Sequence, residues 1–221
     1  MSPIVHALMS WLIAITLLRE LKDRRLAILA GVLPDIDGIF ILFNYDLYLE
    51  YHRRVGHSFL FAIPLMLALG AFATNRKRTM AAGLLIFSVH LFADAMGSID
   101  ANWGVYPFYP LSNISFLGLP WFSDDFCYYT MGPIMGYGTF ILILLLIFVK
   151  EATPLEFFSK KWDRRLVALY VYPFKYHCEE CHKERAMVYC EVCDRKLCPE
   201  HGAGYLSTVC LRCGPGSGKH G

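Results

Sequence analysis

Four pairs of cysteine and histidine residues near the C-terminus have the spacing of metal ligands. The pairs are Cys178-x2-Cys181, Cys190-x2-Cys193, Cys198-x2-His201 and Cys210-x2-Cys213. Eight thiolate and imidazole groups suffice for two tetrahedral zinc ions, and closed ligand sets of this kind support structure and not catalysis. A segment this short buries too little apolar surface to fold alone, so zinc would supply most of its folding free energy. We expect two structural zinc ions within residues 178–213.

The sharing of the four pairs between two ions has two solutions. The string from Tyr189 to His201, YCEVCDRKLCPEH, resembles a B-box-type zinc finger. This resemblance implies a cross-braced arrangement, in which the first and third pairs bind one ion and the second and fourth bind the other. In a nested alternative the second and third pairs share one ion. The spacing does not choose between them.

The charge of this module limits its partners. From Cys178 onward the chain has six Lys or Arg residues and six Asp or Glu residues, so its formal charge balances to zero. A module without a basic face is a poor binder of the phosphate backbone of nucleic acids. We therefore expect the zinc finger to bind a protein partner or to self-associate.

A second set of potential ligands lies in or beside apolar segments. The set consists of His6, Asp35, Asp37, His52, His57, His90 and Asp94. A charged group deep in a bilayer costs several kcal/mol, so each of these residues needs a partner, a cavity or a function. His90 and Asp94 are four residues apart, and on a helix they share one face. Nitrogen and oxygen ligands without a thiolate suit Zn, Mn or Fe, so we expect one or more divalent ions here.

Apolar helices must position these residues. The chain has 221 residues, of which 56% are hydrophobic and 18% are charged, and such a composition is typical of a membrane protein. Five apolar runs are long enough, or nearly so, to cross a hydrocarbon core of about 30 Å. They are residues 3–18, 26–43, 58–73, 80–96 and 131–149. The first and third runs are short and could instead be buried helices. We predict an all-α membrane bundle of about five transmembrane helices.

The second apolar run contains a helix breaker directly before its two aspartates. Pro34 lacks a backbone donor and pushes the preceding residue away from helical geometry. In a regular helix, Asp35 and Asp37 would face nearly opposite ways. A break at Pro34, followed by Gly38, would let both carboxylates reach a common centre.

The distribution of Lys and Arg orients the bundle. Basic residues gather in the connections around residues 19–25 and 76–78 and again after Val149, whereas residues 97–130 contain none. By the positive-inside rule, the N-terminus lies outside and the C-terminal zinc finger is cytoplasmic. This orientation, which ignores the histidines and aspartates, brings the second ligand set to the outer side of a cell membrane.

Three further segments follow the bundle, which we place at residues 1–149. Residues 150–177 form an amphipathic juxtamembrane linker, in which Lys160, Lys161, Arg164 and Arg165 stand beside Phe157, Phe158 and Trp162. This pattern is expected of a helix on anionic lipid, although an exposed linker helix would share it. The zinc finger occupies residues 178–213, and the Gly-rich residues 214–221 are expected to be disordered.

Three strings in the bundle resemble a known family. They are GVLPDID at residues 31–37, HRRVGHS at residues 52–58 and HLFAD at residues 90–94, preceded by His6. They resemble the YdjM-type membrane-bound metal-dependent hydrolases over about residues 1–150. That family is a distant relative of zinc-dependent phospholipase C and the S1/P1 nucleases, so the resemblance implies hydrolysis of phosphoesters, including those of lipids. No His-x-x-x-Glu follows His90, whereas the soluble relatives have one. We therefore expect either fewer metal ions or a replacement ligand such as Asp100, Asp124 or Asp125.

The resemblance leads to a hypothesis about mechanism. Divalent cations would favour ionisation of water near neutrality, and a spare carboxylate would take its proton. Asp37 is our candidate base, and Arg53 our candidate for pairing with a phosphate oxygen; an interfacial arginine on lipid headgroups is the alternative for Arg53. The chain lacks the His-Glu-x-x-His pattern of zinc proteases, which counts against proteolysis.

Two functions of different classes follow from the sequence. The leading hypothesis is a membrane-embedded metal-dependent hydrolase with membrane lipids as neighbours and a phospholipid as a candidate substrate. The alternative is a non-enzymatic membrane adaptor or metal-ion transporter whose zinc finger recruits a partner protein. A transporter needs a polar path through the bilayer, and the cytoplasmic halves of the predicted spans contain no ionisable residue.

Overall fold

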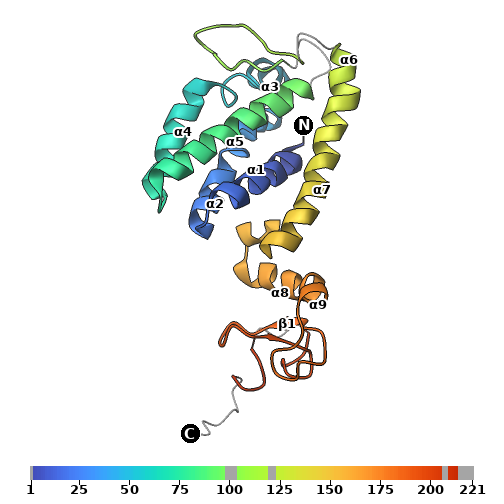
Figure 1. Ribbon diagram of the computed structural model, residues 1–221. Helices are drawn as coiled ribbons and strands as arrows, with labels where there is room; N and C mark the ends of the chain where they lie inside the picture. The colour runs from blue at the N-terminus through green and yellow to red at the C-terminus, as the bar shows by residue number, and fades with distance from the viewer. Residues whose placement is uncertain (1, 98–103, 119–122, 206–208, 214–221) are drawn as a thin grey trace. The chain divides into compact units, whose positions relative to one another are not determined.

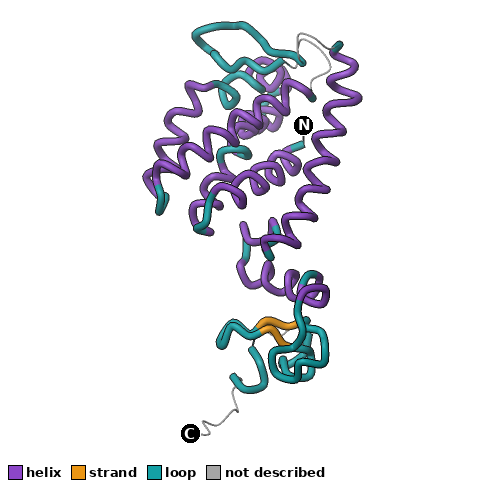
Figure 2. The backbone as a smooth tube through the Cα atoms, viewed as in Figure 1, coloured by secondary structure: helices purple, strands orange, loops and turns teal. Residues whose placement is uncertain are grey.

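The chain is mostly helical and forms two compact units, Met1–Leu142 and Ile143–Gly221. A computed structural model describes residues 2–97, 104–118, 123–205 and 209–213 (Figures 1 and 2). The segment 150–177, expected to be a linker, lies in the same unit as the cysteine-rich segment. The expectation of disorder in residues 214–221 falls outside the described residues, as does Asp100, one of the alternative ligands.

The first unit is a bundle of helices joined by short turns. Its elements are α1 (Pro3–Leu17), α2 (Leu21–Leu29), the 3-10 helix η1 (Leu33–Leu42), α3 (Tyr45–Tyr51), α4 (Phe59–Phe72), α5 (Arg76–Met96), α6 (Asp124–Phe126), the π-helical turn η3 (Cys127–Met131) and the start of α7 (Gly132–Lys150). Ser2, Asn44, Ser58 and Asn75 cap the starts of α1, α3, α4 and α5, because each side chain accepts a backbone N–H of the first turn. The helices therefore begin where the sequence places short polar residues.

The core of this unit is built around α5, which contacts α1, α2 and α4. Trp11, Ala62, Ile86 and Phe87 are buried there. Large apolar side chains on the outer surfaces, such as Leu67, are exposed, so the unit is apolar on the outside as well as the inside. A bundle with this distribution is suited to a lipid environment.

Two helices meet the length and hydropathy expected of a membrane span among the described residues, Arg76–Met96 and Cys127–Lys150. Pro3–Leu17 and Phe59–Phe72 are apolar but shorter. The predicted span at residues 26–43 does not form one helix, because α2 ends at Leu29 and η1 begins at Leu33. The predicted break is therefore present, although Pro34 lies inside the first turn of η1, where a missing N–H costs little.

A buried carboxylate joins α2 to the turn between α4 and α5. Asp23 is 2% exposed, and its two oxygens accept the backbone N–H groups of Thr74 at 2.7 Å and Asn75 at 2.9 Å. Asn75 in turn caps α5. Asp23 therefore fixes the end of the bundle at which three helices meet.

The second unit packs helices against a small cysteine-rich module. Its elements are the end of α7, the 3-10 helix η4 (Pro154–Phe157), α8 (Lys160–Tyr170), α9 (Tyr172–Lys175), β1 (Val188–Tyr189) and β2 (Lys196–Leu197). The strands pair antiparallel, with Val188 opposite Leu197. Val167, Val171 and Tyr172 of the helices form one buried cluster with Ala186 of the module. The helices and the module therefore share a core.

Replacement of Asp23 tests the junction of α2, α4 and α5. We expect Asp23→Ala to lower the free energy of unfolding by about 2–4 kcal/mol, because two backbone donors lose a charged acceptor in a buried place. Asp23→Asn keeps one acceptor oxygen and should cost less. Thermal unfolding of the purified chain in detergent measures the effect, with Asp46→Ala, which removes an exposed carboxylate, as the control. Equal melting temperatures for Asp23→Ala and Asp46→Ala would contradict this role.

Candidate metal centre

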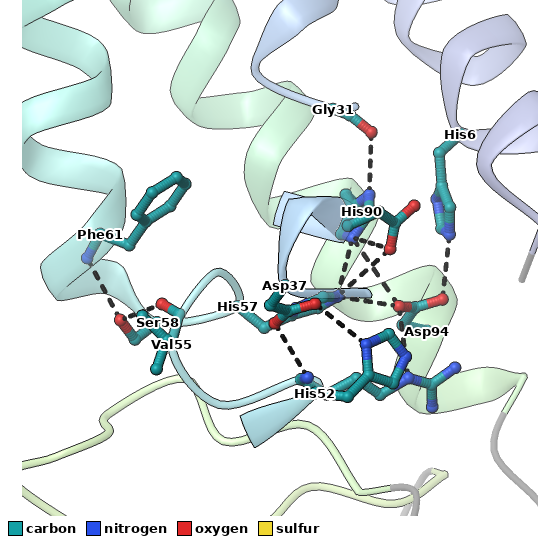
Figure 3. A network of polar contacts seen from close by, with 12 residues as sticks. His6, Gly31, Asp37, His52, Val55, His57, Ser58, Phe61, His90 and Asp94 are labelled. Carbon is teal, nitrogen blue, oxygen red and sulfur yellow. Dashed lines mark hydrogen bonds and ion pairs between the residues drawn. The ribbon is translucent and has the colours of Figure 1, made fainter. Parts of the chain in front are cut away.

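Three elements of the first unit bring ligand atoms to one buried point (Figure 3). His6 comes from α1, Asp35 from η1, and both His90 and Asp94 from α5. One ligand atom from each of these four residues lies within 4.8 Å of every other. His57, from the turn before α4, lies beside them, with its Nε2 3.1 Å from Oδ2 of Asp94 and 3.6 Å from Oδ1 of Asp35.

The hydrogen bond of His90 to the backbone determines its tautomer. Nδ1 of His90 lies 2.9 Å from the carbonyl oxygen of Gly31, which can only accept. Nδ1 therefore carries a proton, and in the neutral ring Nε2 presents its lone pair to the site. This is the form in which an imidazole binds a metal ion, with its other nitrogen donating to a carbonyl or carboxylate.

His57 is oriented in the same way by a carboxylate. Its Nδ1 lies 3.1 Å from Oδ2 of Asp37, and its Nε2 lies 3.1 Å from Nε2 of His90. If both rings are neutral, two lone pairs face each other across this short distance. Such an arrangement needs a cation between them, either a proton on His57 or a metal ion.

The distances among the donors fit a metal ion. A tetrahedral zinc ion with ligands at about 2.0–2.1 Å places its ligand atoms about 3.3 Å apart. Nε2 of His57, Nε2 of His90 and Oδ2 of Asp94 are separated by 3.1–3.7 Å, and Oδ1 of Asp35 lies 3.7 Å from Nε2 of His90. A nitrogen and oxygen set of this kind also suits Mn or Fe.

Asp94 connects the two sides of the site. Its Oδ1 lies 2.9 Å from Nε2 of His6, whereas its Oδ2 faces His57 and His90. Two buried polar atoms, Nδ1 of His6 and Oδ2 of Asp35, have no hydrogen-bond partner among the described residues. Buried donors and acceptors are rarely left unpaired, so these atoms are further support for a ligand at this place.

Asp37 and His52 do not lie with the four converging ligands. Oδ1 of Asp37 is 2.9 Å from Nδ1 of His52, and its Oδ2 accepts the backbone N–H of Arg53 at 3.0 Å in addition to the contact with His57. Both oxygens of Asp37 thus have hydrogen-bond partners, and they lie at the Nδ1 side of His57, whereas the Nε2 side faces the four ligands. This is a position that orients a ligand, and it differs from the ligand and base positions that the sequence predicted.

Arg53 lies beside Asp94 and has an unusual backbone conformation. Its φ of 64° is in the left-handed region, which is unusual for a residue other than glycine, and its carbonyl accepts the Tyr106 N–H at 3.2 Å. Nε of Arg53 is 3.6 Å from Oδ2 of Asp94. The guanidinium partly offsets the charge of three carboxylates, Asp35, Asp37 and Asp94.

Two glycines that the sequence did not single out allow the ligands to meet. A Cβ on Gly31 would lie 2.0 Å from Oγ of Ser10, and a Cβ on Gly56 would lie 2.2 Å from the carbonyl oxygen of Pro34. Gly31 supplies the carbonyl that orients His90, and Gly56 precedes His57. Gly56 allows close approach to the Pro34 backbone, and Gly31 leaves room for the Ser10 and Ile86 side chains. The strings GVLPDID and HRRVGHS contain these glycines without showing which neighbours they touch.

The cysteine-rich module brings its eight ligands into two groups. Cys178, Cys181, Cys198 and His201 form one, and Cys190, Cys193, Cys210 and Cys213 form the other, with ligand atoms within 4.8 Å of one another in each. The first and third pairs along the chain thus share a group, as do the second and fourth. This is the cross-braced order and not the nested one, and both groups have the composition of a metal site.

Backbone hydrogen bonds favour the thiolate form in both groups. Burial raises the pKa of Cys178, but backbone N–H groups, chiefly those of Cys181 and Cys198, outweigh burial and lower this pKa to about 6. The same balance lowers the pKa of Cys190 to about 6, and its sulfur accepts the N–H of Cys210 at 3.2 Å. Since thiolates are the metal-binding form of cysteine, each group has a ligand that is ionised at neutral pH.

The helical bundle matches the model of a known protein family. The family model described as YdjM inner membrane protein matches residues 1–173, and so includes every residue of the candidate site in the first unit. No curated protein and no solved structure matches the chain. The cysteine-rich module, from Cys178 onward, lies outside the matched range.

Paired cysteine variants test the grouping in the module. We expect Cys178→Ser with Cys198→Ser to remove one zinc equivalent, because both residues belong to one group, and Cys178→Ser with Cys190→Ser to remove two. Elemental analysis of the purified chain measures the metal, and Cys127→Ala, a buried cysteine elsewhere, is the control. A nested arrangement would give two lost equivalents for the first pair.

A matched pair of glycine variants tests the approach of the His57 turn to η1. We expect Gly56→Ala to destabilise the chain by about 1–3 kcal/mol and to release metal from the bundle, because the new methyl group meets the Pro34 carbonyl. Gly38→Ala places a Cβ where nothing lies within 4 Å and should be tolerated. Melting temperature and metal content are measured for both. Equal behaviour of the two variants would refute the close contact.

Proposed function

The chain belongs to the YdjM inner membrane protein family, and on this premise we propose that it is a membrane-embedded metal-dependent hydrolase acting on phosphoesters. The observation that carries the proposal is the convergence of His6, Asp35, His90 and Asp94, with His57 beside them, in an apolar bundle. Burying these groups is costly, and orienting hydrogen bonds on His57 and His90 add to the support for a metal-binding role.

Each residue has a role in the proposed reaction. A divalent cation held by His6, Asp35, His57, His90 and Asp94 would supply Lewis acidity, which favours ionisation of water and stabilises charge on a phosphoryl oxygen. Asp35 takes the proton of the attacking water through Oδ2, the oxygen without a hydrogen-bond partner among the described residues. Asp37 holds His57 in the required tautomer. Asp35 thus replaces Asp37 as our candidate base.

Arg53 is suited to bind the negative charge of a phosphoester. Its guanidinium lies beside Asp94, and its backbone is fixed by Asp37 on one side and Tyr106 on the other. An arginine held in this way can pair with a phosphoryl oxygen through two N–H groups. Its position therefore favours an anionic substrate over a neutral one.

The surroundings of η1 favour an amphiphilic substrate. Along this segment Asp35 and Asp37 turn inward, whereas Ile36 and Ile39 are 55% and 50% exposed. A headgroup phosphate could reach the ligands while the chains of a lipid stay on the apolar outer surface. A phospholipid is therefore our candidate substrate, and the Lys and Arg distribution predicts that it is bound from the outer side.

Assays on the purified chain test this function. Wild type is loaded with Zn or Mn and given bis(p-nitrophenyl) phosphate or phospholipid vesicles. We expect Asp35→Asn to lower kcat by about 10²-fold or more, because the proton acceptor is lost. Asp46→Asn removes an exposed carboxylate in the same unit and should keep full activity.

Three results would oppose the proposal. No hydrolysis by the metal-loaded wild type, or equal activity of wild type and Asp35→Asn, would each contradict hydrolysis at this site. Metal uptake into proteoliposomes without hydrolysis would support the metal-ion transporter instead.

A further inference from the structure

One face of α8 lies open to the surroundings and combines basic with aromatic and aliphatic side chains. At 100° per residue, Trp162, Arg165 and Leu169 lie on the side of α8 opposite to Asp163 and Val167, which are buried. Trp162 is 55% exposed, and the Arg165 guanidinium lies over its ring at 5.1 Å. This pattern differs from a plain solvated helix, on which charged residues would cover the open side.

A basic residue extends this face at the start of α8. Lys161 is exposed at the edge of this side of the helix. Lys160 is also exposed but lies on the side of Val167, and Arg164 lies over the Tyr189 ring at 5.2 Å and so belongs to the contact with the module. Phe158, just before the helix, is 79% exposed. We use the name α8 lipid face for Phe158, Lys161, Trp162, Arg165 and Leu169.

Packing holds α8 at the end of α7. Ile147, in the last turn but one of α7, packs on the buried cluster that includes Val167 and Val171. α7 is long and apolar enough to cross a membrane and ends at Lys150. With α7 as a span, this packing would put α8 at the level where the span leaves the bilayer. A linker of unfixed length would not place it there.

Polar contacts strengthen this attachment. The carboxylate of Glu151 accepts the Lys175 Nζ at 2.7 Å and the Tyr176 hydroxyl at 2.5 Å, and Nζ of Lys175 also donates to the Phe148 carbonyl at 3.1 Å. Lys196 of β2 is 3.8 Å from the same carboxylate. These contacts thus join the end of α7 to the helix α9 and to the cysteine-rich module.

Aromatic side chains at the same level have the composition of a membrane interface. Phe174 of α9 is 74% exposed and contacts the ring of Phe148 in α7, with ring centroids 6.4 Å apart. Aromatic rings and lysines gather where a span meets the headgroups, because the rings prefer the interface and the ammonium groups meet lipid phosphates. Cationic charge beside exposed rings matches an anionic surface.

We propose that the α8 lipid face binds the anionic headgroups of the membrane that α7 enters, and so holds the cysteine-rich module against the bilayer. The occupant is the lipid surface itself. The inference rests on α7 as a span and on the charge and exposure of this face. It is independent of hydrolysis at the bundle site.

The test uses the full chain in nanodiscs made with or without roughly one-third phosphatidylglycerol, the rest being phosphatidylcholine. The chain carries 5-fluorotryptophan, and the Trp162 signal is identified by its loss in Trp162→Phe. Lipids with gadolinium on the headgroup broaden fluorine signals near the interface. We expect strong broadening of the Trp162 signal, greater in the anionic discs and reduced at high salt.

Charge reversal separates the α8 lipid face from general electrostatics. We expect Lys161→Glu to reduce the broadening in anionic discs by about twofold, because a phosphate contact becomes repulsive. Lys183→Glu makes the same charge change at an exposed position of the same unit and should have little effect. Metal content equal to that of wild type shows that each variant is folded.

Two outcomes would overturn the proposal. One is a Trp162 signal that the headgroup label does not broaden, and the other is an equal loss of broadening in both charge-reversal variants. A Trp162 signal whose broadening changes with protein concentration, and not with lipid composition, would assign this face to a second copy of the chain instead.

Discussion

The burial of three carboxylates among imidazoles is the constraint on which the first unit depends. Asp37 and Asp94 are almost wholly buried, and Asp35 is largely so. Burying unpaired charge in an apolar bundle is expensive, so the chain surrounds each carboxylate with donors. Asp94 is held between His6 and His57, and Asp37 between His52, His57 and the Arg53 N–H. A cation at the centre would offset the charge that remains.

This polar centre determines how the helices around it are built. Because η1 is a 3-10 helix and not a continuation of α2, Asp35 and Asp37 both reach inward while the isoleucines beside them face outward. Gly31 and Gly56 bring the backbone of this segment against α1, α5 and the His57 turn. Asp23 closes the other end of the same helices through two backbone N–H groups. The bundle thus combines an apolar outside with ionic contacts inside, because charged groups in an apolar bundle need partners.

The second unit is stabilised differently from the first. Its strands β1 and β2 have two residues each, and its buried clusters are small, so we expect the module to need bound metal and the contact with α8 in order to fold. Val167, Val171 and Tyr172 pack on Ala186, and Glu151 joins the end of α7 to Lys175 and Tyr176. The segment that the sequence suggested as a linker is therefore part of a folded unit. Its open face, in contrast, has the composition that the sequence pattern indicated.

Local sequence was enough to predict the helical class, the membrane character and the residue types of both candidate ligand sets, because ligand spacing and apolar runs are local properties. It also indicated that His90 and Asp94 share a helix face, since four residues make about one turn. The tertiary structure alone decided that His57 and His90 face each other, that Asp37 orients His57, and that Gly31 and Gly56 are contact points. It also decided that residues 26–43 do not form a single span. These features depend on which residues from distant segments come within hydrogen-bond distance. That depends on how helices pack, which no local pattern encodes.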